Sequence, residues 1–177
     1  DLAKFSTAVI AGLTGTQVGA LTSQQIAYLT TTQSQALTAT QVAGLSTAQL
    51  AAMEAADFAK LSTTAVTGLT TTQMGALTAD QVAALSTAQL SKLSSTQIGK
   101  IGTAQIQALT TDQAAAHSAT QVEGFSTAQM SKLEAEDLGK FSTAAIAALS
   151  TTQLAALGNA QVASLSTTQA GALTSTQ

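Results

Sequence analysis

The chain repeats an eight-residue word without interruption, and this period constrains the fold more than any other feature. Counting from Phe5 in steps of eight gives 22 words, the last of which begins at Leu173, and no insertion or deletion breaks the register. The first place is Leu in sixteen words, the second is Ser or Thr in eighteen, and the fifth is Gln in seventeen. The consensus is L-[ST]-x-x-Q-Φ-x-x, where Φ is apolar. A fixed period across the chain indicates a repeat array.

An eight-residue period excludes a coiled coil and a flat sheet. In one continuous helix, eight residues at about 100° each overshoot two turns by about 80°, so the first-place column would wind around the helix. In a strand, the first and sixth places have opposite parity and would point to opposite faces. A β-solenoid with corners survives this test and is the alternative fold.

The word is typical of a helix start. Ser or Thr followed three residues later by Gln is the capping box, and apolar residues on either side of it form the hydrophobic staple. Nine of the twelve Gly occupy the seventh or eighth place, where a helix end can use a left-handed residue. We therefore predict an all-α fold in which each octad is one short capped helix.

Single octads cannot fold alone. Ordering eight residues costs roughly 8 to 16 kcal/mol, whereas burying one Leu and one Val returns roughly 3 to 6 kcal/mol. The octads must therefore stack into a solenoid, in which small residues at the seventh and eighth places let successive backbones approach closely. We predict one solenoid of about 22 octads over residues 1–177, interpreted as a fragment of a longer protein. Pairing of the helices into 16-residue hairpins stays open.

A longer motif recurs above the octads. The segment DLAKFST at residues 1–7 returns as DFAKLST at 57–63 and as DLGKFST at 137–143, with spacings of seven and ten octads. Each copy is followed by a word that lacks Gln at its fifth place, and the residues there are Val9, Ala65 and Ala145. These copies indicate a larger unit that is repeated with a variable number of octads.

The composition excludes several classes of function. Charged residues make up 8% of the chain and the net charge is -3, so there is no basic surface to neutralise a nucleic-acid backbone. No apolar run approaches the roughly 20 residues of a membrane span. Cys is absent, so disulfides are not used and the redox compartment stays open.

The charged residues have two interpretations. All six lysines occupy the eighth place, either as a cationic column that meets an anionic partner or as exposed helix ends, where a cation suits the dipole; we favour the exposed ends. The acidic words at residues 54–57 and 134–137 carry Glu54, Asp57, Glu134 and Asp137. Such carboxylates can bind calcium, but they also suit a helix N-terminus, and neither word has the pattern of a calcium loop. We predict no metal site.

The sequence contains no set of residues typical of catalysis. His117 is the only His and stands in the Leu column, so it cannot form a triad or a metal site alone, and we interpret it as a tolerated polar substitution. The capping boxes account for the Ser residues, and no glycine-rich phosphate loop is present. We predict that the protein is not an enzyme, has no catalytic residues and uses no cofactor.

Some words place Thr at alternate positions, as at Thr30 and Thr32. On a β-solenoid, such rows would resemble the Thr ladders of ice-binding proteins. Other words have Gln24, Ala48 or Asp80 at the matching fourth place, so the ladder would be broken in many rungs. Ice binding is therefore the weaker interpretation.

The run LTADQVAALSTAQL at residues 77–90 resembles the octad arrays of very long bacterial surface or secreted proteins of the adhesin-like kind. The resemblance implies a stalk that carries a binding domain away from the cell. We predict a non-catalytic scaffold or stalk, located outside the bacterial cell or on its surface. The alternative is a binding module whose face meets a glycan, a peptide or ice. A protein or glycan partner and self-association stay open.

The core assignment predicts unequal effects of two neighbouring substitutions. Leu85→Asp should cost several kcal/mol, because it buries a charge in the thin core. Thr87→Ala, at a solvent-facing place, should be nearly silent. Thermal denaturation of the two variants checks this, and equal shifts would contradict the assignment.

Overall fold

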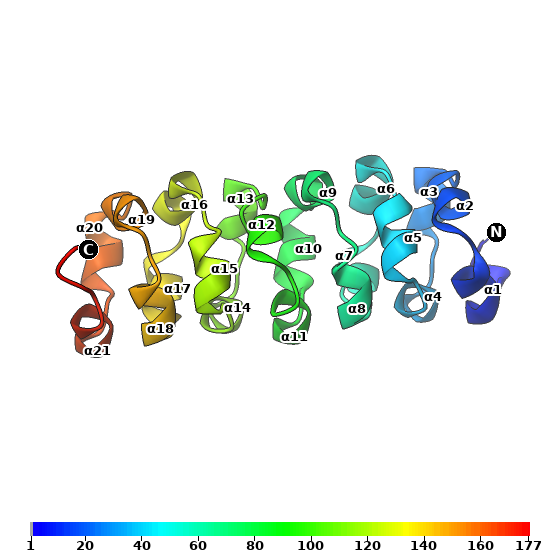
Figure 1. The fold of residues 1–177 in the computed structure, drawn as a ribbon. Coiled ribbons are helices and arrows are strands. Elements are labelled where there is room, and N and C mark those ends of the chain that lie inside the picture. Colours follow the sequence, from blue (N-terminus) through cyan, green and yellow to red (C-terminus); the bar gives the residue numbers. More distant parts are fainter. Residues whose placement is uncertain (1) are drawn as a thin grey trace.

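The computed structural model describes residues 2–177 as an array of short helices (Figure 1). The described chain has one 3-10 helix and twenty-one α-helices, one for each of the first twenty-one octads, and no strand. The predicted all-α solenoid is confirmed, and the alternative β-solenoid is wrong. The flat Thr rows considered for ice binding require the strands of a β-solenoid, and the described residues form none. Asp1, which opens the first copy of the longer motif, lies outside the described residues.

The helices follow one another at the octad period. Their bounds are η1 (Leu2–Lys4), α1 (Thr7–Gly12), α2 (Gly15–Gly19), α3 (Ser23–Ala27), α4 (Thr31–Gln35), α5 (Ala39–Gly44), α6 (Thr47–Ala52), α7 (Ala55–Phe58), α8 (Thr63–Val66), α9 (Thr71–Ala76), α10 (Ala79–Ala84), α11 (Thr87–Leu90), α12 (Ser95–Ile98), α13 (Thr103–Ile106), α14 (Thr111–Ala115), α15 (Ala119–Glu123), α16 (Thr127–Lys132), α17 (Ala135–Lys140), α18 (Thr143–Ala147), α19 (Thr151–Ala155), α20 (Asn159–Ala163) and α21 (Thr167–Gly171).

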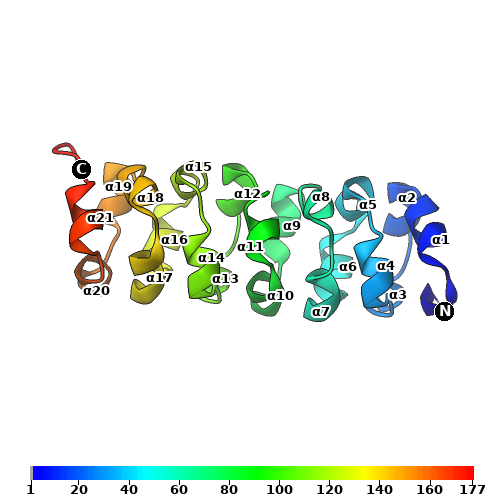
Figure 2. The same cartoon turned by 90° about the horizontal axis from the view of Figure 1, so that it is seen from below.

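Three octads make one turn of the solenoid. The closely packed helix pairs are three apart in the chain, for example α2 with α5, α3 with α6 and α14 with α17. A turn therefore spans 24 residues, and each helix stacks on the helix one turn earlier. The result is an elongated body whose N- and C-terminal ends lie at opposite ends (Figures 1 and 2). This packing excludes the 16-residue hairpin alternative, because consecutive helices occupy different sides of the turn.

The corners between helices are made by two extended residues. At the first corner, Leu13 has φ -68° and ψ 143° and the N-cap Thr14 has φ -73° and ψ 159°. The amide of Leu13 donates to the carbonyl of Ile10 at 3.2 Å, which closes the last turn of α1. No described residue, glycine included, has a positive φ. The prediction that Gly provides left-handed helix ends was therefore wrong, because most C-cap residues are either right-handed helical, like Ala20, or extended, like Leu13.

Gly is required where the backbones of stacked turns touch. A Cβ placed on Gly19 would lie 2.5 Å from the carbonyl oxygen of Gly44, one turn later. A Cβ on Gly99 would lie equally close to the carbonyl oxygen of Gly124. These are distances that real Cβ atoms do not reach, so the small residues allow close stacking. This confirms the expectation of close approach at the seventh and eighth places.

The core is one continuous apolar column along the solenoid. Sixth-place residues between Val42 and Ile146 are fully buried, and first-place residues between Leu29 and Leu149 are at most 6% exposed. The sixth place therefore forms the centre of the core, and the first place packs around it at the corners. No helix in the described residues is long and apolar enough to cross a membrane.

Candidate functional site

The fifth-place Gln closes the capping box of its own helix. In α10, the amide of Gln81 donates to Oγ1 of Thr78 at 3.1 Å, and the amide of Thr78 donates to Oε1 of Gln81 at 3.0 Å. Most of the described helices have both bonds, with Ser or Thr as the N-cap. The predicted capping box is confirmed.

The same Gln side chain also joins its helix to the preceding turn. Nε2 of Gln81 donates to the carbonyl oxygens of Leu50 at 2.7 Å and Met53 at 2.9 Å, which are 31 and 28 residues earlier in the chain. We call this contact the glutamine clamp. It is made by Gln33, Gln41, Gln49, Gln73, Gln81, Gln89, Gln97, Gln105, Gln113, Gln121, Gln129, Gln153, Gln161, Gln169 and Gln177.

The clamp satisfies polar groups that the helix ends leave open. The last carbonyls of an α-helix have no partner within the helix, and here the next turn supplies a donor. The clamp Gln side chains are almost all buried, and Gln81 is 1% exposed. Burial of an amide without partners would be costly, but both ends of this amide are bonded. The clamp therefore fixes the register between turns.

The sequence contains a signal for the clamp that the capping box alone does not explain. A capping box accepts Glu as well as Gln, yet the fifth place holds seventeen Gln and no Glu. Of these two residues, only Gln carries an NH2 group that can donate to a carbonyl while its oxygen accepts. Gln17 and Gln25 are the first two fifth-place glutamines, and no described residue lies 28 positions before either of them. Both side chains are exposed.

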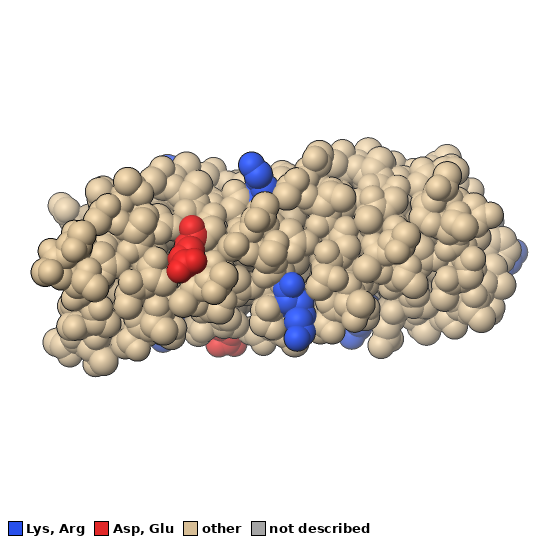
Figure 3. Space-filling view, in the orientation of Figure 1, with Lys and Arg blue, Asp and Glu red and all other residues tan. Residues whose placement is uncertain are grey.

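The lysines do not form a single column. All six are exposed, in agreement with their interpretation as solvated helix ends. Lys92 and Lys100 belong to consecutive octads and therefore lie on different sides of the turn. The face shown in Figure 3 carries its basic and acidic side chains as separate spots. On this face, the side chains of the described residues form no continuous charged surface for an anionic partner.

The acidic words place a carboxylate where the clamp would be. Glu134 is the N-cap of α17 but makes no side-chain cap bond. Asp137 takes the place of Gln, is 2% exposed, and its Oδ2 has no hydrogen-bond partner. Burial, together with the neighbouring carboxylates of Glu134 and Glu136, raises the pKa of Asp137 to about 6.

The earlier acidic word has the same arrangement. Asp57 is buried in the fifth place of its octad, and the N-cap Glu54 makes no side-chain cap bond. Burial, and to a lesser degree Glu54, raises the pKa of Asp57. In the part of the chain that the structure describes, no three His, Cys, Asp or Glu side chains lie close enough to hold a metal ion.

His117 is buried as a neutral ring within an aromatic cluster. Its Nδ1 lies 2.9 Å from the carbonyl oxygen of Gln113, and its Nε2 has no partner. The ring centroid lies 5.2 Å from that of Phe125 and 6.0 Å from that of Phe141. Burial lowers the pKa of His117 to about 4, against the smaller opposing effect of the backbone bonds. His117 stands at the first place of its octad, and its ring packs there as an apolar side chain does.

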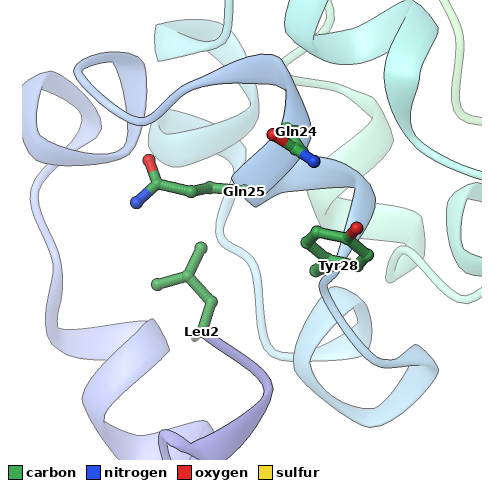
Figure 4. Close-up of a pocket in the computed structure, with 4 residues that line it drawn as sticks. All are labelled: Leu2, Gln24, Gln25 and Tyr28. Atoms are coloured by element: carbon green, nitrogen blue, oxygen red, sulfur yellow. The ribbon is translucent and has the colours of Figure 1, made fainter.

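One hollow lies at the N-terminal end of the solenoid (Figure 4). It has a volume of about 470 Å³ and is lined by Leu2, Gln24, Gln25 and Tyr28. A second hollow of about 250 Å³ is lined by Ser95, Thr96, Gly99, Lys100 and Gly124. Neither lining includes a His, Asp or Glu side chain. These hollows therefore offer no acid and base pair for catalysis.

Comparison with known proteins identifies the repeat. The family model of the ALTTAQ repeat matches residues 1–31, 50–87, 82–118 and 130–167, which together make up more than half of the chain. The comparison with curated proteins finds no match.

Replacing one clamp amide by a carboxylate tests the clamp. Gln81→Glu keeps an oxygen for the capping box but removes both donors and sets a carboxylate against two carbonyl oxygens, so we expect a loss of about 2 to 4 kcal/mol. The matched control is Gln17→Glu, at an exposed fifth place without a clamp bond, where the effect should stay within about 0.5 kcal/mol. Urea denaturation followed by circular dichroism measures both. Equal losses would show that the clamp contributes nothing.

The buried His117 predicts a loss of stability in acid. Its pKa in the folded protein, about 4, lies below the usual 6.5, so the unfolded chain binds more protons and stability falls as the pH drops through this window. Between pH 7 and pH 4.5, the free energy of unfolding of the wild type should fall by about 2 to 3 kcal/mol more than that of His117→Leu. This magnitude follows from about 1.4 kcal/mol per unit of pKa difference between the folded and unfolded states. Other groups titrate in both proteins and cancel in the difference. Identical pH profiles of the free energy of unfolding would contradict the prediction.

Proposed function

The chain belongs to the ALTTAQ repeat family, and we propose on this premise that it is a structural scaffold or stalk within a large bacterial surface or secreted protein. Its role is mechanical and non-catalytic. The resemblance of its octads to arrays in bacterial surface proteins supports this location. The repeat itself supports the mechanical role, because an array lengthens by adding units.

One observation carries the proposal: every clamp Gln donates to the first-place carbonyl 28 residues earlier, and most donate also to the carbonyl 31 residues earlier. Gln41 donates to Ile10 and Leu13, and Gln161 donates to Met130 and Leu133, with the same offsets of 31 and 28 residues. A further turn that meets this pattern adds length without changing the cross-section. Such uniformity suits a spacer, whose useful property is its reach.

The composition of the surface also supports a spacer. The exposed second to fourth places are mostly Thr, Ser and Ala, which present short side chains and little charge. Interfaces are usually centred on aromatic and Arg side chains, and this chain has no Trp and one Tyr. A solvated, weakly charged surface keeps a long rod free of unwanted contacts.

Adding one turn tests the proposal. Duplication of residues 85–108, which are three whole octads, should lengthen the rod by about 8 to 10 Å, the usual distance between packed helices. Small-angle X-ray scattering measures the maximum dimension and the cross-section, and the cross-section should not change. A flexible Gly-Ser insert of the same length at the same point is the control. An unchanged maximum dimension, or a scattering profile like that of the flexible insert, would contradict the proposal.

A further inference from the structure

The glutamine clamp is missing at two places in the described array. The fifth places of two consecutive octads hold Asp57 and Ala65, and those of a later pair hold Asp137 and Ala145. We call these the first unclamped junction, where α7 and α8 stack on α4 and α5, and the second unclamped junction, where α17 and α18 stack on α14 and α15. Each junction begins with the Asp that opens a copy of the longer motif and includes the Ala that follows that copy.

At these junctions, the backbone carbonyls that a clamp Gln would bond have no side-chain donor. A clamp bonds the first-place carbonyl 28 residues earlier, as Gln73 does with Leu45 at 2.6 Å. Counting 28 residues back from Asp57 and Ala65 gives Leu29 and Leu37. Counting back from Asp137 and Ala145 gives Leu109 and His117. Within the described structure, no hydrogen bond reaches these four carbonyl oxygens. Ala cannot donate, and an ionised Asp offers only acceptors.

An independent observation points to the same two places. Three side-chain atoms of the described residues are buried without a hydrogen-bond partner, namely Oγ of Ser34, Nε2 of His117 and Oδ2 of Asp137. Ser34 lies between Leu29 and Leu37 in the first junction, and the other two atoms belong to the second. Buried polar groups without partners favour opening, because water satisfies them once the contact separates.

The junctions are nevertheless closed in the folded structure. Phe58 and Val66 in the first junction are fully buried. In the second, Phe141 packs against His117 and Phe125. The apolar contacts thus continue across both junctions while the polar contacts do not. In a solenoid, where stability is a sum over neighbouring units, opening begins at the interface with the weakest contacts.

We infer that the two unclamped junctions are built-in joints, at which the solenoid opens before its clamped turns do. This goes beyond the proposed stalk and does not depend on it, because the inference concerns the chain's own turns. The joints divide the rod into cooperative segments, set by the spacing of the longer motif. The clamped turns between them stay closed while a joint opens.

Hydrogen exchange of the intact chain tests the joints. Amides in residues 29–37 and 57–66, and in 109–117 and 137–146, should exchange roughly tenfold or more faster than the matching amides of clamped turns, such as 50–53 and 77–82. Mass spectrometry of peptides measures these rates. This comparison uses only the wild type and decides the matter even if a variant fails to fold. Equal protection at junctions and clamped turns would overturn the inference.

Restoring and transplanting the joint adds a stricter comparison. The triple variant Glu54→Ser, Asp57→Gln and Ala65→Gln gives the first junction two regular words, and exchange there should slow roughly tenfold while the second junction keeps its wild-type rate as an internal control. The double variant Gln89→Asp and Gln97→Ala removes two neighbouring clamps and should speed exchange in residues 59–69. If the restored junction exchanges as fast as before, the missing clamps are not the cause of opening.

Discussion

The structure depends on one side-chain amide that bonds in two directions. The oxygen of every clamp Gln except Gln105 accepts from the N-cap amide of its own octad, and the nitrogen donates to a carbonyl of the turn before, as Gln129 does with Ser126, Ile98 and Ile101. The first bond starts an octad and the second places it in the array. Neither Glu nor Asn substitutes, because Glu cannot donate and Asn is one methylene shorter.

The local structure could be predicted from the sequence, because the signals for it lie within eight residues. Ser86 and Gln89 form the capping box that their spacing indicates, and Leu85 and Leu90 are buried as the staple requires. Three octads per turn could not be predicted in this way. That number is set by the angles at corners such as Leu13 and Thr14, which are both extended, and a pattern of residue types does not specify these angles.

The positions without a clamp Gln could be identified in the sequence, but the residues that they contact in the neighbouring turn could not. Val9, Ala65 and Ala145 stand out where Gln is expected, and His117 stands out in the Leu column. The link between His117 and Ala145 is their separation of 28 residues, which has meaning only once the length of a turn is known. The same holds for the acidic word at residues 134–137, because Asp137 takes the place from which a clamp would reach Leu109, 28 residues earlier and in another turn.

The spacing of the longer motif determines the sides of the rod on which the joints lie. The copies at residues 57–63 and 137–143 are ten octads apart, which is three turns and one further octad. Helices α7 and α8 of the first joint lie in the stacks that continue through α10 and α11, and α17 and α18 of the second lie in the stacks of α14 and α15. The two joints therefore share the stack of α8, α11, α14 and α17 and differ in their second stack. A spacing in whole turns would have put both joints on the same two stacks, whereas one further octad offsets the second joint around the rod.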